Sequence, residues 1–265
     1  MSTLLHITDT HLYADLSRML KGITPHDSLA AVLAHAQQQF PSPDAIILGG
    51  DMAQDEAAAT YRRLADILIQ RWRVPFMMTP GNHANIPALN HNLISALARH
   101  SAYSDSLQLP HWQVIALNSH AEGKVAGLLG DDELARLDRL LAEARPRHTL
   151  IALHHHPVPI ASRWLDRIGL TDRQQLWHVI DRHKHVRAVM CGHIHQEFDS
   201  MHNHVRVLGT PSSCVQFKPL HNTFALDGVS PGYRWLQLQP DGSIDTGIVR
   251  VDGFIPADLE NNTPY

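Results

Sequence analysis

Five short motifs in this chain carry side chains of the kinds that bind metal ions. They are Thr-Asp-Thr-His at 8–11, Gly-Gly-Asp at 49–51, Gly-Asn-His at 81–83, His-His-His-Pro at 154–157 and Gly-His-Ile-His at 192–195. Carboxylate and amide oxygens combined with imidazole suit Zn²⁺, Mn²⁺ or iron better than Ca²⁺ alone. Their ligands are too many for one tetrahedral site, so they predict two metals. Two metals about 3.5–4 Å apart hold the attacking and leaving oxygens of a phosphoryl displacement.

Each motif taken singly has an ordinary structural explanation. An isolated Asp-x-His is weak support for a metal site, and Gly-Asn-His is common in loops. The occurrence of all five in one chain, each directly after a predicted strand, favours a shared site over coincidence. In an open α/β sheet the loops at the carboxyl ends of the strands converge on one edge, where ligands bind.

The predicted strands that precede these motifs alternate with segments whose apolar residues repeat with helical periodicity. This alternation is typical of repeated β-α units. Strands are predicted at Thr3–Thr8, Ala45–Gly49, Pro75–Thr79, Gln113–Asn118, Thr149–Leu153 and Arg187–Cys191. Helices are predicted over 27–40, 55–71, 86–100, 131–145 and 171–183. In the second of these, Asp55 is the expected N-cap.

The last quarter of the chain has a different character. Segments 205–209, 223–227, 233–239 and 246–252 are strand-like and joined by Pro, Gly and Asn turns, so antiparallel strands without helix are predicted there. An irregular tail is expected at about 255–265. Because no linker, charge block or repeat divides the sequence, residues 1–265 are predicted to form a single domain.

Composition excludes several classes of partner. The chain has 22 basic and 26 acidic residues, a formal net charge of −4 and no run of Lys or Arg, which argues against a nucleic-acid partner. Neither Cys191 nor Cys214 belongs to a Cys-x-x-Cys pair, so no disulfide framework is expected. No segment approaches the roughly 20 apolar residues that span a bilayer. We therefore expect a cytoplasmic protein with no membrane partner.

The order of the five motifs is similar to that of the calcineurin-like metallophosphoesterase superfamily. Further segments, HITDTHLYAD, GDMAQD, LHHHPVP, CGHIHQEFD, TPSSCVQFKP and SPGYRWLQLQPDG, resemble the bacterial class III cyclic-AMP phosphodiesterases, the CpdA type, over nearly the full length. The resemblance implies an α/β fold, a sandwich of two mixed β-sheets flanked by helices, with the active site at the carboxyl ends of the strands. The segment Thr210–Pro219 strengthens the resemblance, but its residues suggest no role.

The resemblance also implies a role for each site residue. One metal would be held by Asp9, His11 and His195, and the other by Asn82, His155 and His193. Asp51 would bridge them, because two carboxylate oxygens can serve two cations. His155 is preferred within the triple histidine since the family ligand stands two positions before the proline, whereas strand alternation also allows His154 to point away. The residues expected to contact substrate are His11, Asn82, His83, His156 and His195, with a packing role equally open for His156.

The implied reaction is in-line attack on phosphorus by a metal-bridging hydroxide, which opens cyclic AMP to 5′-AMP. His83 is the implied catalytic residue, placed to protonate the leaving oxygen or stabilise its charge. The cofactors are two divalent or mixed-valence transition metal ions, with iron or manganese preferred and zinc or cobalt as alternatives. The partner is then a small cyclic nucleotide. The sequence does not predict an oligomeric state.

One position departs from the family pattern. Family members usually carry Asp or Glu after Gly-Asn-His, where the carboxylate can orient the imidazole and favour its protonated form. This chain has Ala84 there, although Asn85 or another neighbour could supply the hydrogen bond. The expectation is a slowed phosphodiesterase with an intact metal centre. The alternatives are a broader phosphodiesterase or phosphomonoesterase, and a catalytically silent protein that binds metal and nucleotide.

Overall fold

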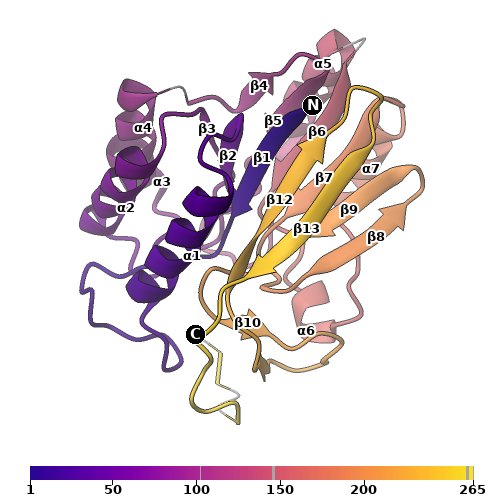
Figure 1. The fold of residues 1–265 in the computed structure, drawn as a ribbon. Helices are drawn as coiled ribbons and strands as arrows, with labels where there is room; N and C mark the ends of the chain where they lie inside the picture. The colour runs from indigo at the N-terminus through magenta and orange to yellow at the C-terminus, as the bar shows by residue number, and fades with distance from the viewer. Residues whose placement is uncertain (102, 145–146, 261–262, 265) are drawn as a thin grey trace.

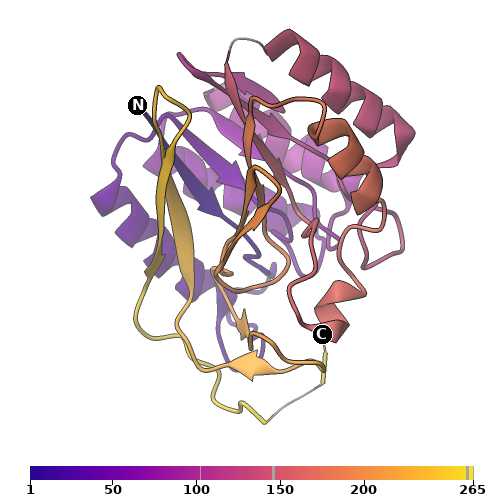
Figure 2. The same ribbon diagram turned by 90° about the vertical axis from the view of Figure 1, so that its right-hand side faces the viewer.

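The structure is a computed structural model that describes residues 1–101, 103–144, 147–260 and 263–264. Two β-sheets face each other, and helices cover the outer face of each (Figures 1 and 2). One sheet has five strands and the other six, and both contain parallel and antiparallel pairs. The predicted sandwich of two mixed sheets flanked by helices is confirmed.

The five-stranded sheet carries the first three motifs. Its parallel strands are β1 (Ser2–Ile7), β2 (Ala45–Leu48) and β3 (Phe76–Met78). Two late strands extend it: β12 (Gly232–Leu238) pairs antiparallel to β1, and β13 (Ile244–Arg250) pairs antiparallel to β12. The carboxyl ends of β1, β2 and β3 therefore open onto one edge.

The six-stranded sheet carries the other two motifs. Its parallel strands are β5 (Trp112–Ala116), β6 (His148–Leu153), β7 (Val186–Cys191) and β9 (Val205–Gly209). The antiparallel edges are β4 (Ser106–Gln108) and β8 (Phe198–His202). The expectation of antiparallel strands throughout the last quarter is wrong for β9, because that segment pairs parallel to β7.

Helices on the two outer faces bury the apolar sides of the sheets. The five-stranded sheet is covered by α1 (Pro25–Gln39), α2 (Ala58–Arg71), α3 (Ile86–Leu89), the π-helical turn η1 (Asn90–Ile94) and α4 (Ser95–His100). On the six-stranded sheet lie α5 (Gly130–Ala144) and α7 (Arg173–Ile180). A short α6 (Arg163–Asp166) lies near the paired strands β10 (Gln216–Phe217) and β11 (Leu226–Asp227) (Figure 1).

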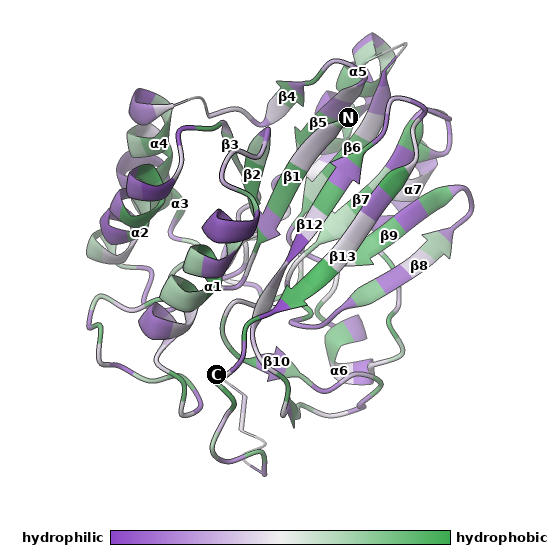
Figure 3. Cartoon of the chain, viewed as in Figure 1, coloured by the Kyte–Doolittle hydropathy of each residue, from purple (hydrophilic) through white to green (hydrophobic). Residues whose placement is uncertain are grey.

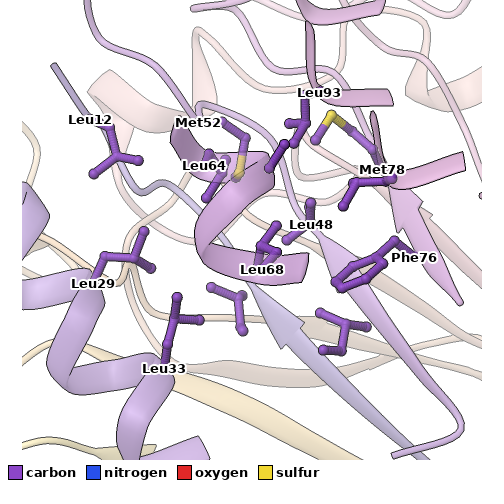
Figure 4. Close-up of a cluster of buried hydrophobic side chains, with 14 of the residues drawn as sticks. Leu12, Leu29, Leu33, Leu48, Met52, Leu64, Leu68, Phe76, Met78 and Leu93 are labelled. Atoms are coloured by element: carbon purple, nitrogen blue, oxygen red, sulfur yellow. The ribbon is translucent and has the colours of Figure 1, made fainter. Parts of the chain in front are cut away.

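Three layers of apolar side chains hold the sandwich together. Leu29 and Leu33 of α1 and Leu64 and Leu68 of α2 pack toward the first sheet (Figure 4). A second cluster, with Leu4, Ile47, Leu150 and Met190, fills the space between the sheets, and a third lies under α5 and α7. Central parallel strands covered on both faces are rich in apolar residues, as in β2, which is green in Figure 3. The motif loops are thus anchored on a rigid frame.

The helix predicted to begin at Asp55 begins at Ala58 instead. One Asp55 carboxylate oxygen accepts from Ala57 N (3.1 Å) and Thr60 Oγ1 (2.8 Å), and the other accepts from Ala14 N (2.6 Å). Asp55 therefore joins the loop after β1 to the loop after β2 and is not the N-cap. Across the described part of the chain, no helix is both long and apolar enough to span a membrane.

Candidate metal centre

The loops after β1, β2, β3, β6 and β7 meet at one edge of the sandwich. Backbone hydrogen bonds join them: Asp9 N donates to the Gly50 carbonyl (3.0 Å), and His11 N donates to the Asp51 carbonyl (3.0 Å). His193 N donates to the Asp9 carboxylate (3.0 Å). The side chains of Asp9, His11, Asp51, His193 and His195 are each at most 5% exposed. Residues from distant parts of the sequence are thereby fixed in one buried cluster.

Most of these residues have a left-handed backbone. The φ angles are 53° for Asp9, 46° for His11, 49° for Asp51, 65° for His193 and 46° for His195. Such values are unfavourable for residues other than glycine, by about 1–3 kcal/mol each, and persist only where the surrounding structure imposes them. Their concentration at one edge is typical of a site whose side chains have a function beyond packing.

Asp9, His11 and His195 form the first ligand set. His11 Nε2 lies 3.2 Å from His195 Nε2, which is 3.3 Å from an Asp9 oxygen. His11 Nδ1 donates to Gln54 Oε1 (2.6 Å), and His195 Nδ1 donates to the Val215 carbonyl (2.9 Å). Burial lowers the pKa of His11 to about 3, so its ring is neutral and its Nε2 presents a lone pair. A carboxylate and an imidazole lone pair directed at one point suit a cation.

Asp51 lies at the centre of the cluster. One of its oxygens accepts from His83 N (2.8 Å), and the other lies 3.3 Å from His154 Nε2. Burial opposes ionisation, but the adjacent imidazoles outweigh it and hold the pKa of Asp51 well below its usual range. A Cβ at Gly81 would lie 2.1 Å from the Asp51 oxygen that accepts from His83 N. Only glycine therefore lets the Gly-Asn-His loop approach Asp51 so closely.

The triple histidine divides differently from the expectation. His154 Nδ1 donates to the Gly49 carbonyl (2.6 Å), which directs Nε2 toward Asp51 (3.3 Å) and Asp9 (3.9 Å). Burial lowers the pKa of His154, but the two carboxylates outweigh burial and raise it to about 9. His154 therefore faces the carboxylates and does not point away from them.

His155, the expected ligand, has both ring nitrogens engaged elsewhere. Its Nε2 donates to the Val125 carbonyl (3.0 Å), and its Nδ1 pairs with Ser119 Oγ (2.8 Å). Strand alternation explains the difference: Leu150 and Ala152 face the other sheet, whereas Ile151 and Leu153 face the helices. Continued past β6, this alternation turns His154 toward the motif loops of the first sheet. His155 lies on the other side of His154, although one of its ring nitrogens is still within 4.8 Å of ring nitrogens of His154 and His193.

Three buried polar atoms complete a second ligand set. Asn82 Oδ1, His154 Nε2 and His193 Nε2 have no hydrogen-bond partner within the described residues. Buried polar atoms are nearly always paired, so these three atoms beside Asp51 require an explanation. The raised pKa of His154 means that its Nε2 carries a proton when no metal is bound. Burial holds the pKa of His193 well below its usual range, which leaves that ring neutral and able to bind a metal. The donor atoms thus fit two transition metal ions.

His156 is not placed to contact a substrate. It is 2% exposed, its Nε2 lies 3.7 Å from an Asp166 oxygen, and its ring fills the space beside Gly169. The ring also lies parallel to that of His193, with centroids 5.9 Å apart. Because His156 does not line the cavity over the ligands, the geometry favours the packing role left open for it.

His83 and Ala84 lie at the open side of the centre. The His83 ring meets the His11 ring edge to face at 5.5 Å and lines the cavity over the ligands. Asn85 does not replace the missing carboxylate, because its Oδ1 caps α3 by accepting from Ala88 N (3.1 Å). Among the described residues, no hydrogen bond orients the His83 imidazole, as expected with alanine at position 84.

Several residues orient the candidate ligands in ways that the sequence did not predict. Gln54 orients His11; the pair Gln54-Asp55 suggested mainly a helix start, with a supporting role at the site as the lesser alternative. The segment Thr210–Pro219 now has a role: Ser212 Oγ donates to the Asp9 carbonyl (2.7 Å), and Val215 fixes the His195 ring. The only signal for these contacts was the segment's resemblance to the family.

Two cavities adjoin the centre. One, of about 320 Å³, is lined by His11, Asp51, His83, His193 and His195 together with aromatic side chains. The other, of about 670 Å³, shares Asn82 and His83 with the first. Small-molecule sites generally have volumes of roughly 300–1,000 Å³. The candidate metal ligands therefore lie at the floor of a space large enough for a small ligand.

Comparison with known proteins supports the fold and the family to which the motifs point. A dimetal phosphatase from Danio rerio superposes with a TM-score of 0.64 at 14% identity, covering 95% of this chain and 99% of its own. The chain is 38% identical to a Vibrio vulnificus protein named 3′,5′-cyclic adenosine monophosphate phosphodiesterase CpdA, over 96% of this chain and 92% of that protein. A protein of the same name from Escherichia coli K12 is 39% identical, with 94% and 89% covered. Residues 2–197 match the Calcineurin-like phosphoesterase family, and the chain therefore belongs to that family.

Proposed function

We propose that this chain is a dinuclear-metal phosphodiesterase that hydrolyses cyclic AMP to 5′-AMP. The observation that carries the proposal is the meeting of two buried ligand sets at Asp51, with unpaired nitrogen and oxygen atoms directed at one place. The names of relatives 38% and 39% identical over nearly the whole chain support cyclic AMP as the substrate.

One metal would be held by Asp9, His11 and His195, and the other by Asn82, His154 and His193, with Asp51 between them. His154 replaces His155 in this proposal because His154 Nε2 faces the carboxylates. When bound, such a pair of metals lowers the pKa of a water molecule and neutralises phosphate charge. The donor atoms are compatible with iron or manganese, and also with zinc or cobalt.

The side chains of the protein supply positioning and a proton. Gln54 and Val215 hold the rings of His11 and His195 by their Nδ1 atoms, so the ligand atoms need little rearrangement. His83, half-buried at the cavity wall, would donate a proton to the leaving ribose 3′-oxygen. With Ala84 beside it, that imidazole lacks a carboxylate to orient it, and we infer a reduced rate.

The test is product analysis with counted metals. Protein loaded with Mn²⁺ or iron to two metals per chain should convert cyclic AMP to 5′-AMP, and an Asp51→Asn variant at equal concentration should not. A faster reaction on an aryl phosphodiester or a phosphomonoester would favour the broader activity. Tight nucleotide binding without turnover at two metals per chain would contradict the enzymatic proposal and favour a silent binding protein.

A further inference from the structure

One wall of the 320 Å³ cavity plays no part in holding metals. It is formed by Trp164 of α6, Phe217 of β10 and Phe224 just before β11. Each pair of rings meets edge to face, with centroids 5.0 Å apart for Trp164 and Phe217, 5.3 Å for Trp164 and Phe224, and 5.5 Å for the two phenylalanines. This mutual arrangement makes a rigid aromatic surface.

The aromatic wall is fixed directly to the metal centre. The Phe217 ring stacks on the ring of His195, with centroids 4.0 Å apart and planes 9° apart. The backbone N–H of Phe217 also donates to the His195 carbonyl (3.2 Å). A ligand whose phosphate reached His195 would therefore have its other end beside these rings.

Trp164 offers an unused hydrogen-bond donor. Its indole Nε1 is buried and has no partner in the residues that the structure describes. The indole nitrogen can only donate, and buried tryptophan N–H groups normally find an acceptor. Because Nε1 is buried, a molecule in the cavity contacts the indole ring and not this donor.

The second cavity is a poor place for a flat apolar ring. Its lining includes Glu56, Glu122 and Lys124 and contains no Phe, Tyr or Trp within the described residues. Charged walls suit water and ribose hydroxyls, whereas bases bind by stacking on aromatic faces and edges. The two cavities share His83, so a nucleotide could place its phosphate at the centre and its base in the aromatic cavity.

We propose that Trp164, Phe217 and Phe224 form the nucleobase subsite, where the base of the nucleotide packs against their rings. This inference rests on the proposed function, because it assumes that the phosphate of a nucleotide binds at the metals. Beyond the proposed function, it names the residues that determine specificity for the base. These residues affect the binding of the nucleotide and not the chemical step.

The experiment compares Trp164→Ala, which removes the ring, with Trp164→Phe, which keeps a ring but removes the donor. Trp235→Phe is the matched control, because Trp235 is half-buried on β12 and packs on Phe40, outside both cavities. For each metal-loaded variant, kcat and KM are measured on cyclic AMP and on the base-free diester methyl 4-nitrophenyl phosphate. Binding of 5′-AMP and of ribose 5-phosphate is measured by calorimetry.

Trp164→Ala should raise KM for cyclic AMP by roughly 5- to 150-fold, the range for losing one base-stacking partner. Trp164→Phe should raise it less than Trp164→Ala does, because an aromatic ring remains for the base to pack against. Turnover of the base-free diester should change less than about twofold in both variants, and Trp235→Phe should match the unmodified chain. Only 5′-AMP binding should weaken, with ribose 5-phosphate unaffected.

Unchanged KM for cyclic AMP in Trp164→Ala would overturn the subsite, and so would an equal loss on both substrates, which indicates a structural role. Failure of the proposed function has a different signature: the unmodified chain would hydrolyse the base-free diester but not cyclic AMP. The base subsite would then be tested by calorimetry alone. Tighter binding of 5′-AMP than of ribose 5-phosphate would support it, and equal binding would reject it.

Discussion

Replacing His154 by Ala should remove one metal, whereas replacing its neighbour His155 by Ala should not. The two residues are adjacent in sequence and equally buried, but only His154 directs a ring nitrogen at Asp51 and Asp9. The ring of His155 is bound to Ser119 and Val125 instead. The pair is therefore a matched test of which imidazole is the ligand.

The size of the effect follows from the electrostatics at each ring. Burial lowers the pKa of His154, yet the carboxylates of Asp51 and Asp9 raise it to about 9 from 6.5. At about 1.4 kcal/mol per pKa unit, the site favours a positive charge on that ring by about 3.5 kcal/mol, equivalent to roughly 300-fold. A metal ion must displace the proton from that ring, but its two positive charges are attracted by the same carboxylates. At His155, both ring nitrogens already have partners in Val125 and Ser119, so neither is free to bind a cation without losing a hydrogen bond.

The assay is metal stoichiometry by elemental analysis, combined with Mn²⁺ titration by calorimetry at pH 7. His154→Ala should bind one metal at least 100-fold more weakly than the unmodified chain. His155→Ala should keep two metals within tenfold affinity, and should lose about 1–3 kcal/mol of unfolding free energy because Ser119 and Val125 lose a partner. Two tightly bound metals in His154→Ala and one in His155→Ala would refute the reasoning and restore His155 as the ligand.

Three other substitutions test separate parts of the account. Ala84→Asp should raise kcat on cyclic AMP by roughly tenfold at equal metal occupancy, since a carboxylate would orient the His83 ring; equal rates would remove the role of this position. Gly81→Ala should weaken metal binding, because its Cβ would lie 2.1 Å from an Asp51 oxygen, and unchanged Mn²⁺ affinity in calorimetry would contradict this. Burial lowers the pKa of His6 to about 3 from 6.5. The unfolded chain therefore binds the extra proton, so the contribution of His6 to stability is complete above pH 6.5 and falls by up to about 1.4 kcal/mol per pH unit below it. In urea unfolding between pH 7 and 5, His6→Gln should lose less stability than the unmodified chain, and parallel curves would contradict the linkage.

The motifs predicted the position of the centre because strand ends and ligand types are both local features. Asp9, Asp51 and His193 each follow a strand that is recognisable from its apolar run. Since the ends of parallel strands share an edge, their meeting could be predicted without knowing any distance. The packing of two sheets against each other was predicted from the family resemblance, because periodicity alone does not determine it.

The sequence could not decide between His154 and His155, because the choice depends on which face of β6 looks toward the other sheet. That face is set by tertiary packing of Ala152 and Leu153 on opposite sides of the strand. Gln54 was missed for a similar reason, since its contact with His11 joins residues 43 positions apart. The prediction that a helix begins at Asp55 was wrong because the Asp55 carboxylate also accepts a long-range hydrogen bond from Ala14 N.

Anomalous diffraction from a crystal of the Mn²⁺-loaded chain is the most direct measurement of the central claim. We expect two manganese peaks about 3.5–4 Å apart, with the Asp51 carboxylate between them and His154 on one of them. A single peak, or manganese bound away from Asp51, would contradict the two-metal centre on which the proposed activity depends.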